Sequence, residues 1–226
     1  MLAIVDYKAG NLTSVKLALE TMGVTGTITS DPDVVVSADR VIFPGVGAAG
    51  AAMQNLRNFG LDNALRDVVQ RGVPLLGICV GMQVLLDFSE EDGGTEMLGF
   101  IPGRVVRFQP TNHWDKVPQI GWNSVRWDRG ADRIGVNRIG TDGNVRRSPE
   151  KTESAFFRKV ANKSDFYFVH SYYPVPKNHS HILAQTDYAG ITFASVLQYE
   201  NIIATQFHPE KSGKIGLQLL ENFIKQ

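Results

Sequence analysis

The sequence predicts an α/β fold with a mostly parallel central sheet, flanking helices and added antiparallel strands. In the first hundred residues, short apolar runs alternate with segments whose apolar residues recur every three or four positions. Strands that alternate with helices indicate a parallel sheet covered on both faces. After Gly99, strand-like segments are joined mainly by turns, which indicates the antiparallel additions. We expect a single domain over residues 1–226, because no linker rich in proline, glycine and serine interrupts it.

The elements follow in order from these patterns. Residues 2–6 form an apolar strand, and Asn11 can cap a helix whose apolar residues recur at helical spacing until Gly23. Further strands are expected at residues 24–29, 41–43 and 74–78, with helices at residues 48–59 and 61–70. Later strands are expected at residues 103–108, 123–127, 166–172, 181–186, 191–198 and 202–207, before a closing helix at 214–224.

Residues 128–156 contain the least regular stretch of the chain, with mixed charges, several glycines and no sustained period. We expect an irregular insertion there, either a solvated loop or an extra hairpin, because loops tolerate insertions. A contact with a partner protein is the alternative interpretation.

Composition favours a cytoplasmic protein. The 43% hydrophobic residues can fill a core, and 23 basic against 23 acidic residues give no bias toward nucleic acid or a membrane. No apolar run is long enough to span a bilayer, and the start at Met1 lacks the pattern of a signal peptide. A single cysteine excludes an internal disulfide.

That cysteine, Cys79, lies in the segment PLLGICVGMQ between Gly77 and Gly81. An apolar run that stops at such a turn predicts a strand end that opens a helix, where exposed amides favour a deprotonated sulfur. Cys79 is therefore a candidate nucleophile. A buried structural thiol is the alternative.

A second segment, IIATQFHPE, places His208 and Glu210 directly after another apolar strand. A histidine there can accept the thiol proton, while a carboxylate two residues on fixes the tautomer and orientation of the imidazole. A surface His-Pro turn is the alternative.

A third segment, VIFPGVGAAG at residues 41–50, is an apolar strand that runs into a glycine-rich turn. Glycines let backbone N–H groups approach a substrate, as an oxyanion hole requires. A simple strand-to-helix connection is the alternative.

Together the three segments resemble the class I (triad) glutamine amidotransferases, whose nucleophile lies in a GxCxGxQ turn and whose histidine and glutamate form HPE near the C-terminus. The resemblance covers nearly the whole chain. It implies the flavodoxin-like fold of that family and a catalytic triad of Cys79, His208 and Glu210.

Segments outside the triad resemble the glutaminase subunits of imidazole glycerol phosphate synthase: LAIVDYKAGNLTSV, VPQIGWNSV, DFYFVHSYYPV and HPEKSGKIGLQLLENF. This resemblance implies that L-glutamine is hydrolysed and that ammonia is channelled to a cyclase subunit, in a heterodimer of histidine biosynthesis. Two residues depart from the family. Lys8 stands where a glycine is usual, and Gln119 where a histidine is common.

The remaining roles are mainly implied by the resemblance. The backbone N–H of Val80 is a candidate oxyanion donor from its place beside Cys79, and the resemblance adds the turn with Val46 and Gly47. The substrate-binding residues implied are Gly47, Gln83, His170, Ser171 and Tyr172, and the partner interface implied contains Asn11, Trp122, Asn123, Tyr167 and Lys211. We expect the turn to form an incomplete oxyanion hole until a liganded cyclase docks.

We expect no metal and no cofactor. The five histidines are scattered, and the phosphate-binding pattern GxxxxGK[ST] does not occur. Three other functions remain open: a paralogous subunit that supplies ammonia for another metabolite such as a surface sugar, a stand-alone cysteine hydrolase, and a binding-only pseudoenzyme.

Overall fold

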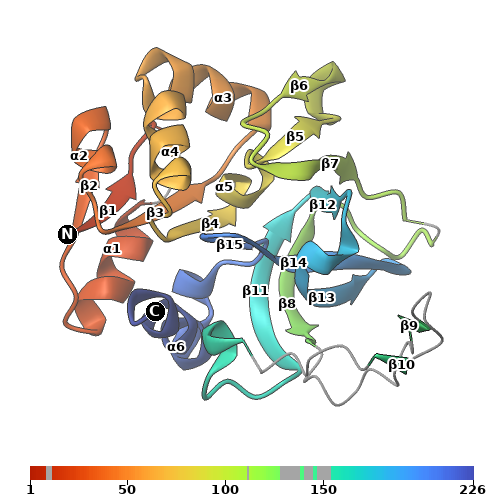
Figure 1. Cartoon of the computed structure of the whole chain (residues 1–226). Helices are drawn as coiled ribbons and strands as arrows, with labels where there is room; N and C mark the ends of the chain where they lie inside the picture. Colours follow the sequence, from red (N-terminus) through yellow and green to blue (C-terminus); the bar gives the residue numbers. More distant parts are fainter. Residues whose placement is uncertain (9–11, 111, 128–137, 140–144, 147–153) are drawn as a thin grey trace.

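A computed structural model describes residues 1–8, 12–110, 112–127, 138–139, 145–146 and 154–226 (Figure 1). Asn11 and most of the predicted insertion at 128–156 lie outside the described residues. Within that insertion, β9 (Arg138–Ile139) and β10 (Val145–Arg146) pair as antiparallel strands.

The main sheet confirms the predicted fold class. Its strand order is β13-β14-β15-β4-β3-β1-β2. The parallel strands are β1 (Leu2–Val5), β2 (Gly26–Thr29), β3 (Arg40–Gly45), β4 (Leu75–Cys79) and β15 (Ile202–Thr205). The order β2-β1-β3-β4-β15 is the doubly wound order of flavodoxin-like folds. On the β15 edge, β14 (Ile191–Tyr199) and β13 (Ile182–Tyr188) add the antiparallel strands.

Helices cover both faces of the parallel strands. In Figure 1, α2 (Pro32–Val36), α3 (Ala49–Asn58) and α4 (Leu61–Gln70) lie on one face, and α1 (Leu12–Thr21) and α6 (Gly213–Ile224) lie on the other. Burial on both faces explains why the central strands read as continuous apolar runs, since every residue of β4 is buried. The four-residue helix α5 (Val80–Gln83) follows β4 directly.

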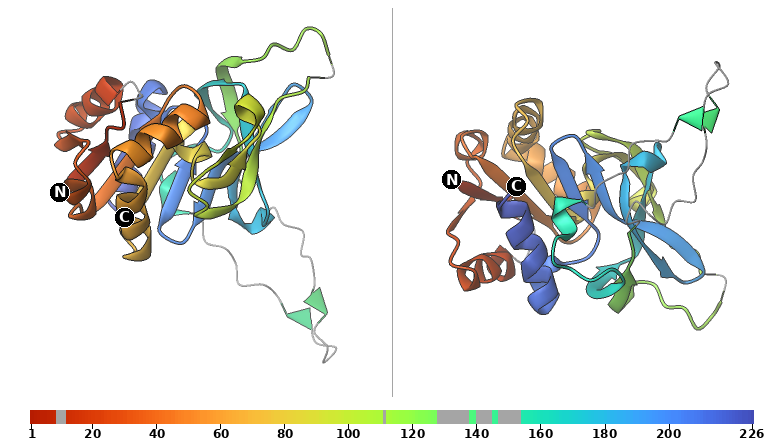
Figure 2. Two further views of the ribbon diagram at one scale, coloured as in Figure 1. Left: turned by 90° about the horizontal axis from the view of Figure 1, so that it is seen from above. Right: turned by 60° about the horizontal axis from the view of Figure 1, so that its bottom comes forward.

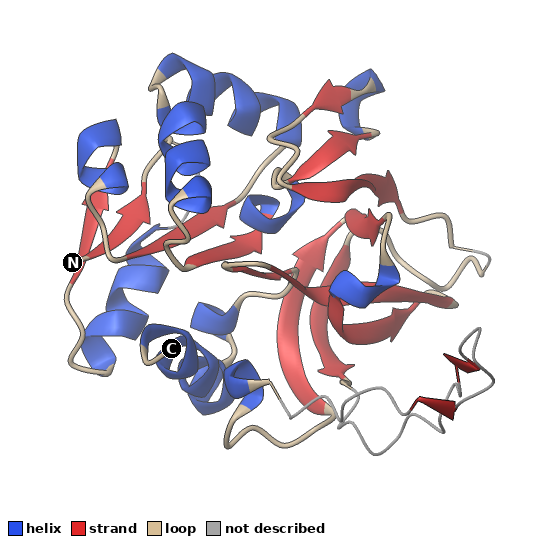
Figure 3. Cartoon of the chain, in the orientation of Figure 1, coloured by secondary structure: helices blue, strands red, loops and turns tan. Residues whose placement is uncertain are grey.

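A second group of strands lies beside the β15 side of the main sheet (Figure 3). One sheet has the order β12-β7-β5-β6, formed by β12 (Tyr172–Pro176), β7 (Ile101–Arg107), β5 (Leu86–Ser89) and β6 (Thr95–Glu96). A separate pair joins β8 (Gln119–Val125) to β11 (Ser164–His170). Aromatic rings join the pair to the main sheet, because Phe168 contacts Phe193 of β14 and Phe207.

Short 3-10 helices complete the chain: η1 (Glu91–Gly93), η2 (Ala155–Phe157), η3 (His179–His181) and η4 (Pro209–Lys211). Both chain termini lie at the end of the molecule away from the β13–β14 hairpin (Figure 2).

Two expected strands have other bounds in the structure, and the elements α2, β5 and β6 were not expected. The strand expected at 123–127 is β8 and starts earlier, at Gln119. The strand expected at 166–172 is broken at Ser171, because β11 pairs with β8 while β12 pairs with β7. No element was expected at 32–36, yet α2 forms there, capped by the Asp31 side chain that accepts from the Asp33 N–H.

Lys8, which stands where the family usually has a glycine, adopts a strained backbone conformation. Lys8 has a φ of 61°, in the left-handed region that favours glycine. Its N–H and its Nζ each donate to a carboxylate oxygen of Asp6 at 2.8 Å. These two bonds hold in place a conformation that a glycine adopts without strain.

Candidate active site

The carboxyl ends of three neighbouring parallel strands bring the predicted catalytic segments together. In the register of the sheet, Gly45 of β3 lies opposite Cys79 of β4, and Ile78 lies opposite Thr205 of β15. A cleft of about 330 Å³ opens at this edge. Its lining contains Cys79 and His208, all predicted oxyanion and substrate residues (Val46, Gly47, Val80, Gln83, His170, Ser171 and Tyr172), and also Glu91, Pro118 and Val169.

Cys79 occupies a strained turn between β4 and α5. Its φ of 56° and ψ of −113° are unfavourable for any residue with a side chain, and such strain is typical of functional sites. Gly81 permits the turn, because a Cβ at that position would lie 1.9 Å from the backbone oxygen of Phe43. Cys79 is only 3% exposed, and its Sγ lies 3.9 Å from the Val169 carbonyl oxygen.

His208 and Glu210 form a buried pair across the same cleft. The Nδ1–H of His208 donates to Glu210 Oε1 at 2.7 Å, and both side chains are 3% exposed. Nε2 is therefore the ring atom left for chemistry, and it has no hydrogen-bond partner among the residues that the structure describes. Burial alone would lower the pKa of His208, but the neighbouring Cys79 and Glu210 outweigh it and raise that pKa to about 10.

The backbone around His208 is fixed by a serine hydroxyl. Ser212 Oγ–H donates to the His208 carbonyl at 2.7 Å, and the same oxygen accepts from the Tyr167 N–H at 3.0 Å. The His208 N–H in turn donates to the Tyr167 carbonyl at 2.9 Å. His208 is thus tied directly to β11.

The carbonyl of Tyr172 fixes two of the predicted substrate residues. It accepts from Gln83 Nε2 at 2.9 Å and from His170 Nδ1–H at 2.7 Å. Burial lowers the pKa of His170 to about 4, although its bond to Tyr172 opposes the shift. His170 is therefore neutral near pH 7, and it contributes shape to the cleft without a charge.

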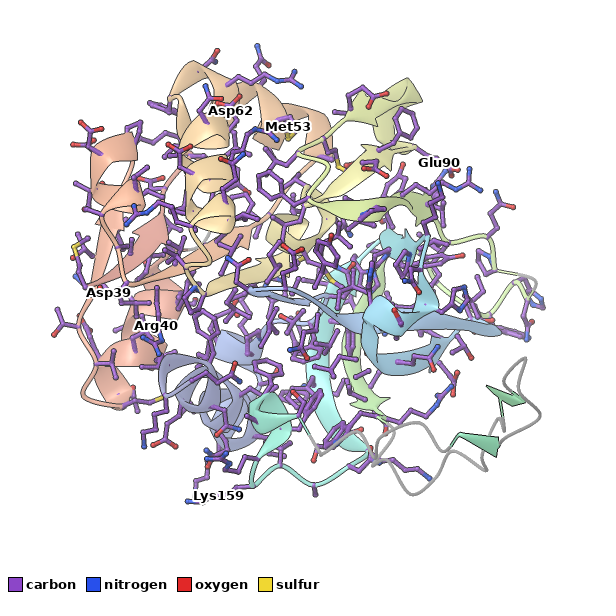
Figure 4. All side chains as sticks on the ribbon, viewed as in Figure 1. Asp39, Arg40, Met53, Asp62, Glu90 and Lys159 are labelled. Atoms are coloured by element: carbon purple, nitrogen blue, oxygen red, sulfur yellow. The ribbon has the colours of Figure 1, made fainter. Side chains whose placement is uncertain are left out.

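Glu91 is a cleft residue that the sequence interpretation missed. Its Oε2 accepts from the Ala49 N–H at 2.7 Å, and burial raises its pKa. The sequence offers no signal that separates it from Glu90, because both belong to one acidic run. In the structure Glu90 lies at the surface (Figure 4), 3.9 Å from Arg104, whereas Glu91 lines the cleft.

Three of the predicted interface residues lie together on the outside of β8 and β11. Tyr167 is paired with Trp122, their ring centroids are 6.1 Å apart, and Lys211 Nζ lies 6.0 Å from the Tyr167 ring. We call Trp122, Tyr167 and Lys211 the aromatic-lysine cluster. Asn123 does not join it, because strand alternation points its side chain to the other face of β8, where it accepts from Gln119 Nε2 at 2.7 Å.

Neither a metal centre nor a membrane span emerges from the described part of the chain. No group of three or more histidine, cysteine, aspartate or glutamate side chains is arranged there to hold a metal ion. None of the described helices is long and apolar enough to cross a membrane.

Comparisons with known proteins agree on one family. The model of the family described as "Glutamine amidotransferase class-I" matches residues 3–226. The imidazole glycerol phosphate synthase subunit HisH of Dehalococcoides mccartyi strain CBDB1 is 44% identical over 225 residues, which cover 100% of this chain and 97% of that protein. The HisH subunit of Maridesulfovibrio salexigens is 45% identical, covering 100% of this chain and 96% of its own.

Solved structures support the same fold. The structure of PurLQS from Thermotoga maritima superposes with a TM-score of 0.68 at 15% identity, covering 99% of this chain and 97% of its own. A crystal structure of a glutamine amidotransferase superposes with a TM-score of 0.65 at 17% identity, covering 99% and 97%. At these identities the likeness concerns the fold alone.

Proposed function

Because the chain belongs to the class I glutamine amidotransferases, and within them to the family of imidazole glycerol phosphate synthase subunits HisH, we propose that it is the glutaminase subunit of such a synthase. It hydrolyses L-glutamine and passes the ammonia to a cyclase subunit. The observation that carries the proposal is the strained Cys79 facing the buried His208–Glu210 pair in one cleft.

In the first half of the reaction, the Cys79 thiolate attacks the side-chain carboxamide carbon of glutamine. His208 carries the matching proton on Nε2, in line with its raised pKa. It donates this proton to the departing nitrogen as the carbon–nitrogen bond breaks. Ammonia leaves, and a γ-glutamyl thioester remains on Cys79.

In the second half, His208 Nε2 takes a proton from a water molecule, whose oxygen attacks the thioester carbon. The carbon–sulfur bond breaks, which releases glutamate and restores the thiolate. Glu210 keeps the imidazole oriented through both halves. The N–H of Val80, with one from the Val46–Gly47 turn, stabilises the oxyanion of each tetrahedral intermediate. Losing one such donor typically costs about 100- to 1,000-fold in rate.

Glu91 and Gln83 bind the amino acid end of the substrate. The α-ammonium of glutamine needs an acceptor, and the Glu91 carboxylate supplies a charged one on the cleft wall. Gln83 uses its amide hydrogens on Tyr172 and Gln206, so its Oε1 is left to accept from the same ammonium. The backbone of residues 170–172 completes this end of the cleft.

Replacing Glu91 with glutamine is expected to raise KM for L-glutamine by about 10- to 100-fold, since a hydrogen bond to a charged group contributes about 1.5–3 kcal/mol. A glutamine side chain can still accept from the Ala49 N–H, so the turn stays in place. Steady-state kinetics measure KM and kcat, and kcat should change much less than KM.

Glu90→Gln is the matched control. It removes the same charge from the preceding residue, which lies at the surface beside Arg104. Its KM should equal that of the parent protein. An unchanged KM in Glu91→Gln would remove Glu91 from the substrate site.

The aromatic-lysine cluster is the proposed docking surface for the cyclase. Trp122 is 56% exposed, which is unusual for so large an apolar side chain. The cluster lies behind the catalytic histidine, because Tyr167 bonds the backbone of His208. Ammonia released at Cys79 therefore has a short route to a partner that docks on this surface.

The experiment that tests the proposed function is reconstitution with the cyclase from the same organism. With amide-labelled ¹⁵N-glutamine and unlabelled ammonium in the buffer, the cyclase product is expected to carry mostly ¹⁵N, because the nitrogen moves between subunits without mixing. Mass spectrometry of the product measures the label. A stable complex whose product contains only buffer nitrogen, or no complex at all, would point to a stand-alone hydrolase or a subunit for another metabolite.

A further inference from the structure

We propose that Gln206 is a positioning residue that holds the Cys79 thiolate and the Gln83 side chain at the same time. The inference deepens the proposed function, and it concerns a side chain that the sequence interpretation did not select. Gln206 follows β15, is fully buried, and donates its backbone N–H to the Ser195 carbonyl at 2.9 Å. Its amide side chain spans the space between the nucleophile and the substrate-binding glutamine.

Two contacts define the role. Gln206 Nε2 lies 3.8 Å from Cys79 Sγ, within range of an N–H···S hydrogen bond. Gln206 Oε1 accepts from Gln83 Nε2 at 3.0 Å. One amide group therefore contacts both the sulfur that attacks and the side chain that binds the substrate.

The direction of the Gln206 amide is fixed by a backbone group at the far end of the network. The Tyr172 carbonyl can only accept, so Gln83 must present its Nε2 to it. The same Nε2 then donates to Gln206, which must turn its Oε1 toward Gln83. This leaves the N–H of Gln206 facing Cys79. Flipping the Gln206 amide alone would bring two N–H donors together, and flipping both amides would bring two oxygen acceptors together at Tyr172.

The chemical consequence is a preference for the charged sulfur. A thiolate is a much better hydrogen-bond acceptor than a thiol, so an N–H aimed at Sγ stabilises the reactive form more than the resting one. Cys79 is 3% exposed, and burial by itself would oppose that charge. Gln206 offsets this penalty, and through Gln83 it also keeps an oxygen directed at the substrate.

The test uses the fact that Cys79 is the only thiol in the chain. Its rate of alkylation by iodoacetamide, measured against pH on the full chain, reports the fraction of thiolate without a need for catalysis. Gln206→Met fills a similar volume without a donor, and it is expected to raise the pH midpoint of alkylation by about one unit. In the reconstituted enzyme the same variant is expected to lower kcat about 10-fold and to raise KM as Gln83 loses its support.

Gln206→Glu separates the two tasks. Its carboxylate still accepts from Gln83 Nε2, so KM should stay near that of the parent protein. It offers no donor to the sulfur and adds a like charge, so the pH midpoint of alkylation should rise at least as far as in Gln206→Met. If Gln206→Met does not fold, this variant carries the test.

Thr205→Val is the matched control. It removes a buried hydrogen bond one residue away, from Thr205 Oγ1 to the Phe207 carbonyl at 3.0 Å, without touching Cys79 or Gln83. Thermal melting should show that Thr205→Val loses about as much stability as the Gln206 variants, while the pH midpoint of its alkylation stays that of the parent protein. An unchanged midpoint in the folded Gln206 variants would overturn the proposal and leave Gln206 a packing residue. Because alkylation needs neither glutamine nor a partner, this failure is distinct from a failure of the proposed function.

Discussion

Replacing Cys79 with serine or alanine is expected to abolish glutamine-dependent synthesis by the reconstituted pair and to leave ammonium-dependent synthesis intact. The glutaminase rate should fall by at least about 10⁴-fold, as it does when a triad nucleophile is removed from other enzymes. The cyclase needs only ammonia, so added ammonium salts should restore product. Parallel assays with glutamine and with ammonium chloride as the nitrogen source measure both activities.

Substitutions of the other two residues of the proposed triad are expected to reduce the glutaminase rate to different extents. His208→Ala removes the proton carrier and should match the Cys79 variants, again with ammonium rescue. Glu210→Gln keeps an acceptor oxygen within reach of Nδ1 and should retain measurable activity, because in the proposed mechanism Glu210 only orients the ring. Substantial glutaminase activity in Cys79→Ala would refute the triad assignment.

Adding the cyclase with its nucleotide ligand is expected to raise the rate of glutamine hydrolysis by orders of magnitude over the isolated chain. We propose that the Gly45–Gly47 turn populates mostly a form with an incomplete oxyanion hole when the chain is free. The turn has the features such a switch requires, because Val46 is 37% exposed and Gly47 has a φ of 87° that few other residues adopt. Docking then selects the competent form.

The energy required is within reach of an ordinary interface. Moving the competent form from about 1% to about 99% of the population requires about 5.5 kcal/mol of differential binding.

A coupled assay of glutamate formation, titrated with cyclase, measures the activation. Trp122→Ala, at the exposed end of the aromatic-lysine cluster, should shift the titration to higher cyclase concentrations, whereas Trp114→Ala, an exposed tryptophan outside the cluster, should not. Full activity of the chain alone would move the assignment toward a stand-alone hydrolase.

The strand ends that line the candidate active site could be predicted from the sequence for a physical reason. Parallel strands buried on both faces appear in the sequence as continuous apolar runs, so reactive residues and glycine-rich turns directly after such runs are easily recognised. Cys79, His208 and the Gly45–Gly47 turn follow three such runs, and the register places all three at one edge of the sheet. Predicting that these strand ends lie close together therefore required no knowledge of side-chain positions.

Residues outside the strand ends could not be found in this way. Glu91 belongs to a 3-10 turn in an acidic run, and only the direction of its side chain separates it from Glu90. Gln206 is one polar residue in a buried segment, and its role depends on the orientation of two amides. The break at Ser171 was missed for a similar reason, because the change of pairing partner from β8 to β7 leaves no local signal.

The two glycines on either side of Cys79, Gly77 and Gly81, differ in how strictly the structure excludes a larger residue. A Cβ at Gly77 would meet the tip of the Leu85 side chain at 2.8 Å and the Gly81 backbone oxygen at 3.1 Å. A Cβ at Gly81 would meet the Phe43 backbone oxygen at 1.9 Å, and that oxygen belongs to the strand leading to the oxyanion turn. A side chain at position 77 therefore requires a smaller residue at position 85 and a small shift of the Gly81 backbone, whereas no side-chain change elsewhere makes room for one at position 81. Any side chain at position 81 would therefore disturb both the strained turn at Cys79 and the strand that leads to the Gly45–Gly47 turn.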